Sequence, residues 1–270
     1  KDYSVGGGGI LLYHLKDTNQ ASIGNAVISG NTVTNGPGGG IEGLQLSSSY
    51  RNHLIAAYVV LSGNRATKGG GICLLNDTKR GLMEANLSNT VITGNTATEL
   101  GGGFSLEAES NAADSTAVTF NESCAVYDNT AGNGADDFYK SDESTTVNAL
   151  PTAVQMSAAA KNAVISGWYK DEEGNRYNEA AADKYTPEVS TTKSLQLKAV
   201  KAAQYNVIFD WNDGSSTTNT VSALAGTTLG DQMPAAPTRS GYTFTGWNTQ
   251  ANGQGTVFNK DTVVNGALTV

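Results

Sequence analysis

Short apolar runs, separated by glycine and small polar residues, recur along the first half of this chain. The segments 57–61 and 90–93 are typical, being brief and rich in valine and isoleucine. Such β-branched side chains favour strands. The runs lack the 3.6-residue spacing of amphipathic helices. The pattern therefore predicts a mainly β protein built from short strands.

Two sequence markers repeat in a fixed phase along these strands. The first is a glycine triplet followed by an apolar residue, and its copies begin 31, 31 and 32 residues apart, at Gly7, Gly38, Gly69 and Gly101. The second is an apolar pair followed by Ser-Gly-Asn or Thr-Gly-Asn, with one degenerate copy, and its asparagines are Asn31, Asn64, Asn95 and Asn129. A period of this length predicts a solenoid.

The length of the repeat suits one coil of a parallel β-helix, which needs three short strands and their turns. Stacked coils would place the four asparagines above one another. We expect their side-chain amides to hydrogen-bond along the stack, as amide ladders do in cross-β structures. We also expect these asparagines to take the left-handed backbone conformation, which Asn tolerates. The glycine triplets would allow sharp turns where a Cβ does not fit.

The pairing of these two markers resembles the right-handed β-helix repeats of bacterial surface proteins, such as the chlamydial polymorphic outer-membrane proteins and related adhesins. The segment Gly132–Tyr139 is similar to the way such arrays end. The resemblance covers residues 1 to about 140 and implies a right-handed parallel β-helix of about four to five coils. Lys1 falls within the repeat pattern, so we expect the natural protein to continue N-terminally.

The repeat stops at Ser141, and two Gly-Trp pairs follow, at Trp168 and Trp247. The second lies in the sequence RSGYTFTGW, residues 239–247, within a segment that opens with the apolar run 207–209. This part resembles the B-repeat of Listeria and Bacteroides surface proteins, which implies a β-grasp-like module. The family pattern continues with an aromatic strand end beyond Val270, so we expect the module to be incomplete here.

These signals divide the chain into three predicted parts. Residues 1–140 form the β-helix, and residues 204–270 form the B-repeat-like module. Residues 141–203 are either a divergent small module or a cap that closes the last coil, since an exposed coil end is an edge that needs covering. The prediction is one β-helix followed by one or two small modules.

Composition and charge limit the partners. With a net charge of −8, the chain lacks the basic patch that binds a phosphate backbone, so nucleic acid is not an expected partner. No apolar run approaches the roughly 18 residues of a membrane span. With 16% charged residues and an acidic balance, the chain suits an extracellular protein. Two cysteines, Cys73 and Cys124, cannot form a disulfide framework, and we expect both to be buried small hydrophobes.

Polysaccharide lyases and hydrolases also use β-helices, and the candidate catalytic groups of such an enzyme are carboxylates. Asp136 and Asp137 are adjacent, and neighbouring residues on a strand face opposite ways. We therefore interpret them as a polar end to the last coil. Three further carboxylates follow glycine triplets, and we expect all three to face solvent without a shared basic partner: Glu42, Glu107 and Glu109.

The remaining candidates also favour structural roles. His14 and His53 lie in different phases of the repeat, so we expect surface or loop histidines and no metal site. The glycine triplets lack the lysine and helix of a phosphate-binding loop, and no cofactor is expected. Three tryptophans offer stacking surfaces for sugars, although we expect core positions for all three: Trp168, Trp211 and Trp247.

The sequence thus predicts no catalytic, cofactor or metal residues. It favours a non-catalytic adhesin-type region of a cell-wall-attached, extracellular bacterial surface protein. A β-helix would present a rigid face to a surface glycan or protein, and the B-repeat module would act as a stalk. We expect a monomer. Two alternatives stay open: a fragment of a polysaccharide lyase or glycoside hydrolase, and a purely structural spacer.

Overall fold

The chain is almost entirely β in the computed structural model, which describes residues 6–13, 18–46, 50–78, 81–108, 116–121, 123–141, 145–151, 153–154, 163–181, 184–185 and 194–270. The helices among these residues are two short 3-10 turns, Glu179–Ala181 and Gly230–Gln232. The chain divides into two compact units, Lys1–Lys201 and Ala202–Val270, which are described separately below.

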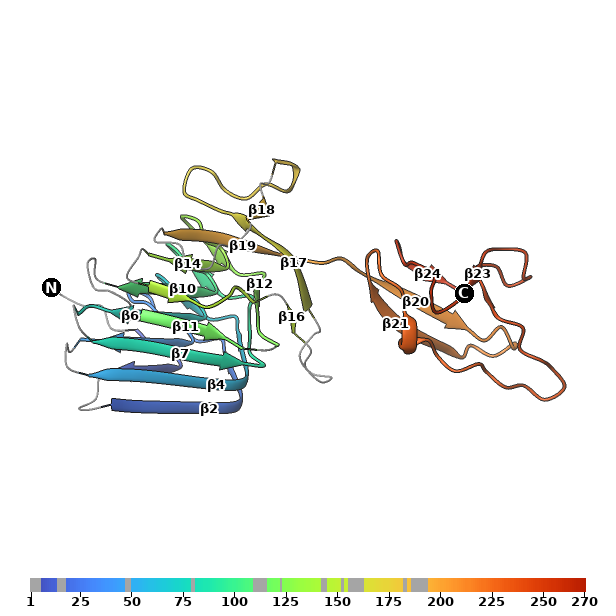
Figure 1. Cartoon of the computed structure of the whole chain (residues 1–270), viewed down its shortest axis with the longest axis horizontal. Helices are drawn as coiled ribbons and strands as arrows, with labels where there is room; N and C mark the ends of the chain where they lie inside the picture. Colours follow the sequence, from blue (N-terminus) through green and yellow to red (C-terminus); the bar gives the residue numbers. More distant parts are fainter. Residues whose placement is uncertain are drawn as a thin grey trace. The chain divides into compact units, whose positions relative to one another are not determined.

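The first unit begins as a solenoid in which successive coils add strands to three parallel sheets (Figure 1). Four strands of the first sheet follow the glycine triplets and a fifth follows Asp137. They stack in register, so that Ile10, Ile41, Ile72, Phe104 and Phe138 form one row. These strands are β1 (Ile10–Tyr13), β3 (Ile41–Gln45), β6 (Ile72–Asn76), β10 (Phe104–Ala108) and β14 (Phe138–Lys140).

The second sheet carries the longest strands, and the third the shortest. In the second sheet, the first two coils each contribute one bent strand where later coils contribute two (Figure 1). Its strands are β2 (Thr18–Ser29), β4 (Arg51–Ser62), β7 (Leu82–Ser88), β8 (Val91–Thr93), β11 (Thr116–Phe120), β12 (Ala125–Tyr127) and β15 (Thr145–Val147). The third sheet contains β5 (Arg65–Ala66), β9 (Thr96–Ala97) and β13 (Thr130–Ala131). The predicted parallel β-solenoid is confirmed, with about four coils.

An asparagine ladder runs through the stack, as predicted. The Nδ2 of each asparagine donates a 2.9 Å hydrogen bond to the Oδ1 of the next, from Asn31 to Asn64, Asn95 and Asn129. The same Oδ1 atoms also accept the backbone N–H of the preceding ladder residue, at 2.9–3.0 Å. The last three asparagines are buried. Burial makes these bonds structural, because an unpaired amide in the core is costly.

The predicted left-handed backbone at these asparagines is wrong. The positive φ belongs to the residue before each one, at 69°, 64°, 65° and 55° for Gly30, Gly63, Gly94 and Asp128. The glycine carries the turn, and the asparagine that follows is free to point its amide into the stack. Asp128 fills the glycine position in the degenerate copy, because Asp tolerates this conformation better than most residues.

Each glycine of a triplet has its own steric reason, as the third copy illustrates. Gly69 has a φ of 56°, which L-residues rarely adopt. A Cβ on Gly70 would lie 2.5 Å from the carbonyl oxygen of Gly102 in the next coil. A Cβ on Gly71 would lie 2.6 Å from the carbonyl oxygen of Gly103. The triplet therefore lets two coils approach backbone to backbone, which refines the predicted role in turning.

The last coil is covered by antiparallel strands from residues that follow the repeat. β19 (Leu195–Lys201) pairs with β14, and β17 (Ala163–Lys170) pairs with β19. Two short strands, β16 (Ala153–Val154) and β18 (Lys184–Tyr185), pair with β17. Trp168 packs edge-on against Phe138, with ring centroids 6.4 Å apart. This segment thus closes the core of the solenoid, and below it is called the cap.

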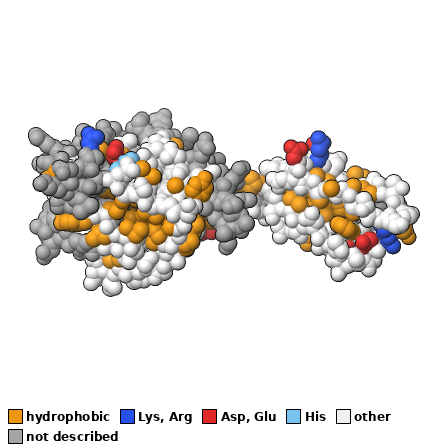
Figure 2. All heavy atoms as spheres, turned by 90° about the horizontal axis from the view of Figure 1, so that it is seen from below, with side chains coloured by type: hydrophobic (Ala, Val, Ile, Leu, Met, Phe, Trp, Pro, Cys, Tyr) orange, Lys and Arg blue, Asp and Glu red, His pale blue; other side chains and the backbone are white. Residues whose placement is uncertain are grey.

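The first coil differs, because its core side chains are only partly covered by described residues. Ile10, Leu12, Ile23 and Ala26 are half-buried and pack on the core from one side. Val27 is 70% exposed. Figure 2 looks onto this end of the solenoid from below, and hydrophobic side chains are gathered on its surface.

The second unit is a small β module with its own core. β20 (Gln204–Asp210) pairs antiparallel with β21 (Thr218–Leu224) and parallel with β24 (Leu268–Thr269). β22 (Trp247–Asn248) and β23 (Val257–Phe258) form a separate pair. Aromatic rings dominate the core: Phe209 lies edge-on to Trp247, with centroids 4.8 Å apart, and to Phe258 at 5.8 Å.

Candidate functional site

The adjacent carboxylates Asp136 and Asp137 lie under the cap, where the solenoid ends. The Oδ1 of Asp137 accepts the Nδ2 of Asn129 at 2.9 Å, so this carboxylate terminates the asparagine ladder. Its Oδ2 accepts the backbone N–H of Ala199, at 2.9 Å. Asp137 is fully buried. These bonds fasten the cap to the last coil, which confirms the prediction of a polar end to the repeat.

Asp136 belongs to an ion-pair network that holds the same junction. The Nη2 of Arg176 lies 2.6 Å from Asp136 Oδ1, and its Nε lies 2.8 Å from Asp171 Oδ1. Burial would raise the pKa of Asp171, but hydrogen bonds from the Arg176 side chain and from the backbone of Tyr177 and Asp136 hold it below its usual value. The network joins the cap to the last coil through two ion pairs of one arginine.

Glu42 is not in solvent, and the prediction that it faces water is wrong. It is fully buried on the outer side of the first sheet, in register with Leu11 and Cys73. Its Oε2 accepts the backbone N–H of Gly6 at 2.6 Å, whereas its Oε1 has no hydrogen-bond partner among the described residues. Burial raises the pKa of Glu42 to about 7. Its position, two residues after a glycine triplet, carries no sequence signal of this burial.

Glu107 has a basic partner, which the sequence did not predict. Lys68 Nζ lies 2.7 Å from Glu107 Oε2, and the Ser105 hydroxyl donates to Oε1 at 2.7 Å. The side chain of Glu107 is only 14% exposed, so the prediction that it faces solvent is also wrong. Glu109 lies outside the described residues. Lys68, in the loop before one glycine triplet, thus pairs with a carboxylate on β10 of the following coil.

Both cysteines are free thiols and both are buried, as predicted. Cys73 lies beside Glu42 in the first sheet, and burial raises the pKa of its thiol well above the usual value. Cys124 lies before β12, and burial raises the pKa of that thiol too. A raised pKa keeps each sulfur protonated and poorly nucleophilic.

His53 lies on β4, half-buried, with its Nε2 2.9 Å from the Nδ2 of Asn86. It is therefore on a strand, while His14 lies outside the described residues. Within the described ranges, no three His, Cys, Asp or Glu side chains gather in a way that would hold a metal ion. Nor does any described helix have the length and apolar character to cross a membrane.

The outer side of the second sheet presents a regular array of side chains. On β4 and β7, alternate residues are buried and half-exposed, so every second side chain points outward. Register brings the outward residues of successive coils side by side. We call this surface the second-sheet face, and its members are Gln20, Ser22, His53, Ile55, Glu84, Asn86, Ala117 and Thr119.

The three tryptophans differ in burial. Trp168 and Trp247 are buried, as predicted. Trp211 is 40% exposed, which corrects the prediction of a core position. It follows β20, whose inward residue is Phe209, and the chain then turns at Asn212, where φ is 48°. The turn leaves the indole outside the core, where it lines a cavity of about 380 Å³.

The second unit contains the sheet of β20, β21 and β24 and the buried Trp247. Residues 205–270 match the model of the Listeria-Bacteroides repeat domain. Comparisons with curated proteins and with solved structures give no match. The family match covers less than half of the chain, so the solenoid is described by its structure alone.

The Listeria-Bacteroides repeat domain confirms the resemblance of the segment around RSGYTFTGW. This repeat is typical of extracellular surface proteins, and together with a β-solenoid it fits a surface-protein region. The cavity beside Trp211 lies within the repeat domain, since its lining residues fall between Asp210 and Val270. The two candidate binding surfaces of the chain are therefore the second-sheet face of the solenoid and this cavity.

Proposed function

We propose that this chain is an adhesin-type region of a bacterial cell-wall-attached surface protein, and that the second-sheet face binds a surface glycan or protein. The observation that carries the proposal is the in-register outward array on four successive coils. Neighbouring strands in such a sheet lie about 4.8 Å apart, so equivalent side chains recur at that interval. A repeating ligand suits a repeating surface.

The rigidity of the solenoid supports this role. Backbone hydrogen bonds join every glycine triplet to the next coil, and the buried asparagine ladder joins the coils a second time. A surface fixed in this way loses little conformational entropy when it binds. The binding energy then comes from many small contacts over a broad, shallow area, with no deep pocket.

The chemistry of the second-sheet face also supports binding. Amide and hydroxyl groups from Asn86 and Thr119 alternate with the apolar side chain of Ile55 and the imidazole of His53. Such a mixture offers hydrogen bonds to hydroxyls or peptide groups and apolar contact between them. The face has few charges, which suits neutral ligands.

The state of the carboxylates favours binding over catalysis. A glycoside hydrolase needs two accessible carboxyl groups, one acid and one base or nucleophile. Glu42 is fully buried, and Glu107 is already paired with Lys68 and Ser105. Asp136 and Asp137 serve the cap. The Listeria-Bacteroides repeat domain would act as the stalk that displays the solenoid.

A binding screen with matched variants tests the proposal. The 270-residue protein is applied to immobilised oligosaccharides and host extracellular-matrix proteins, and hits are measured by surface plasmon resonance. The double variant Asn86→Arg, Thr119→Arg is expected to bind at least ten-fold more weakly, because two long cations cover the second-sheet face. The control Thr96→Arg, Thr130→Arg alters the third sheet and is expected to bind like the wild type.

Each other result argues against adhesion by this face. If the control variant weakens binding as much as the test variant does, the ligand binds outside the second-sheet face. Release of oligosaccharide fragments from a polysaccharide, detected by mass spectrometry, identifies an enzyme. Absence of binding to every immobilised ligand leaves the chain as a structural spacer.

A further inference from the structure

The Listeria-Bacteroides repeat domain contains a cavity at its surface, outside its hydrophobic core. The cavity measures about 380 Å³, within the size range of small-molecule pockets. Its lining comes from four places: the turn after β20, the loop before β22, the loop after β22 and the end of β24 at Thr269 and Val270. Elements distant in sequence therefore converge on one hollow, as they do in ligand sites.

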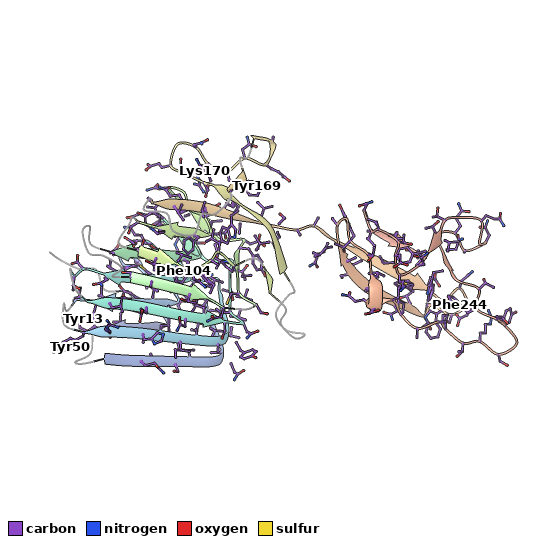
Figure 3. All side chains as sticks on the ribbon, in the orientation of Figure 1. Tyr13, Tyr50, Phe104, Tyr169, Lys170 and Phe244 are labelled. Atoms are coloured by element: carbon purple, nitrogen blue, oxygen red, sulfur yellow. The ribbon has the colours of Figure 1, made fainter. Side chains whose placement is uncertain are left out.

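Aromatic rings form a large part of the cavity lining. Trp211 is 40% exposed and Phe244 is 38% exposed, although both are large apolar side chains. Phe244 lies edge-on to the buried Trp247, with ring centroids 5.0 Å apart, and Figure 3 marks its place in the unit. The ring of Trp247 thus links the exposed Phe244 to the core. Exposed apolar surface at a hollow marks a binding position.

Charged groups share the same cavity. The guanidinium of Arg239 lies over the ring of Tyr242, 4.2 Å from its centroid, and forms no salt bridge with a described residue. Asp210 and Asp213 also line the cavity. One oxygen of each is held by a neighbouring backbone N–H, from Asn212 and Ser215, at 2.8 Å. The cavity therefore offers fixed donors and fixed acceptors together.

The walls of the cavity are preformed. The Asn212 side chain donates to the carbonyl oxygen of Ala251 at 2.9 Å, which ties the turn after β20 to the loop after β22. The Asn248 side chain donates to the carbonyl oxygens of Gly253 and Gly255, at 3.2 Å each. These bonds hold the two loops in position without a ligand, so binding carries a small ordering cost.

We propose that this cavity binds a short saccharide. A sugar ring has a C–H face that stacks on aromatic rings, and hydroxyls at its rim that both donate and accept hydrogen bonds. Trp211 and Phe244 match the first property. Arg239, as a donor, and Asp210 with Asp213, as acceptors, match the second. A purely apolar ligand would leave three charged groups unused, and an anion would face two carboxylates.

This site is independent of the proposed adhesive face, because it lies in the other compact unit and uses none of the same residues. The repeat domain would then contribute recognition of its own, beyond acting as a stalk. The two proposals can fail separately. The double variant Asn86→Arg, Thr119→Arg tests the second-sheet face, and Trp211→Ala tests the cavity.

The test begins with a printed array of bacterial and host oligosaccharides, probed with the 270-residue protein. The strongest hit is then titrated while tryptophan fluorescence is recorded, since Trp211 lies in the cavity. Trp211→Ala and Phe244→Ala are each expected to weaken binding at least ten-fold. Tyr58→Ala removes an exposed aromatic ring from the solenoid and is the matched control, with unchanged affinity. Far-UV circular dichroism and the thermal midpoint verify that the variants fold.

Three outcomes would overturn the proposal. They are the absence of any bound oligosaccharide, unchanged affinity in Trp211→Ala, and unchanged affinity in Phe244→Ala.

Discussion

Each of the two units is stabilised internally by a different kind of interaction. The solenoid buries polar side chains in a repeating order, with Asn64, Asn95 and Asn129 each bonded to the coil above and the coil below. The Listeria-Bacteroides repeat domain, residues 205–270, buries no polar side chain and relies on one aromatic cluster around Trp247.

This difference determines how far a destabilising substitution affects the rest of its unit. In the solenoid each coil contacts its two neighbours, so stability is nearly a sum of similar interfaces, and a local loss stays local. In the repeat domain every core residue contacts the same cluster, so a single truncation is felt by the whole unit. The experiments below test this contrast, from the largest expected effect to the smallest.

Trp247→Ala is expected to unfold the repeat domain and spare the solenoid. Removing a buried tryptophan costs about 4 kcal/mol, and a domain of this size is stable by about 3–10 kcal/mol. Hydrogen exchange read by mass spectrometry should lose protection within 205–270 and keep it within 50–108. The exposed Trp211, changed to alanine, is the control and should keep protection in both. Loss of protection in the solenoid would contradict the division.

Asn95→Ala should destabilise the solenoid by about 3 kcal/mol, because the buried backbone N–H of Asn64 loses its acceptor. The Nδ2 of Asn64 and the Oδ1 of Asn129 each lose one hydrogen bond and keep another. Asn31→Ala, at the half-buried end of the ladder, should cost about 1 kcal/mol. Urea unfolding followed by circular dichroism measures both. Equal losses at the two positions would mean that burial does not govern the strength of the ladder.

Glu42→Gln should remove a pH dependence from the stability of the solenoid. The folded-state pKa of Glu42, about 7, lies above its usual value of 4.5, so folding binds a proton between these values. The free energy of unfolding of the wild type therefore falls as pH rises from about 4.5 to 7. At pH 8 the variant should be more stable by about 3 kcal/mol. Parallel pH profiles for both proteins would contradict the buried, raised carboxyl.

Lys68→Met should have the smallest effect, about 1 kcal/mol, because its partner Glu107 is only partly buried and water screens the pair. The loss should shrink further in 1 M salt, where the Debye length is about 3 Å. Thermal unfolding at low and high salt measures this. The exposed pair of Lys201 and Asp128 offers the comparison, and Lys201→Met should change stability even less.

Sequence periodicity predicted the solenoid because its markers have strict steric and hydrogen-bonding roles. A glycine such as Gly71 is required wherever a Cβ would enter the next coil, and a buried amide such as Asn95 needs another amide above it. Such positions tolerate few alternatives, so they recur visibly. The repeat domain was predicted through a motif, RSGYTFTGW, whose tryptophan fills the core.

Other features follow from tertiary structure and leave no such trace. The bend in the second sheet takes a positive φ at residues of three different types, Asn25, Tyr58, Asn89 and Ser123. Glu42 was expected in water because the alternation of one strand does not reveal what covers its outer side. Trp211 was expected in the core because single tryptophans of small modules are usually buried, although it lies one residue beyond the end of its strand.

The asparagine ladder has a direction, and this has a consequence for the length of the molecule. Every amide donates toward the cap, and the series ends at Asp137, whose carboxylate only accepts. Duplicating or deleting a whole repeat between Asn31 and Asn129 leaves the donor at one end and the carboxylate at the other unchanged. Copy number, and with it the height of the displayed surface, is therefore a quantity that gene-level repeat expansion can adjust without redesigning the cap.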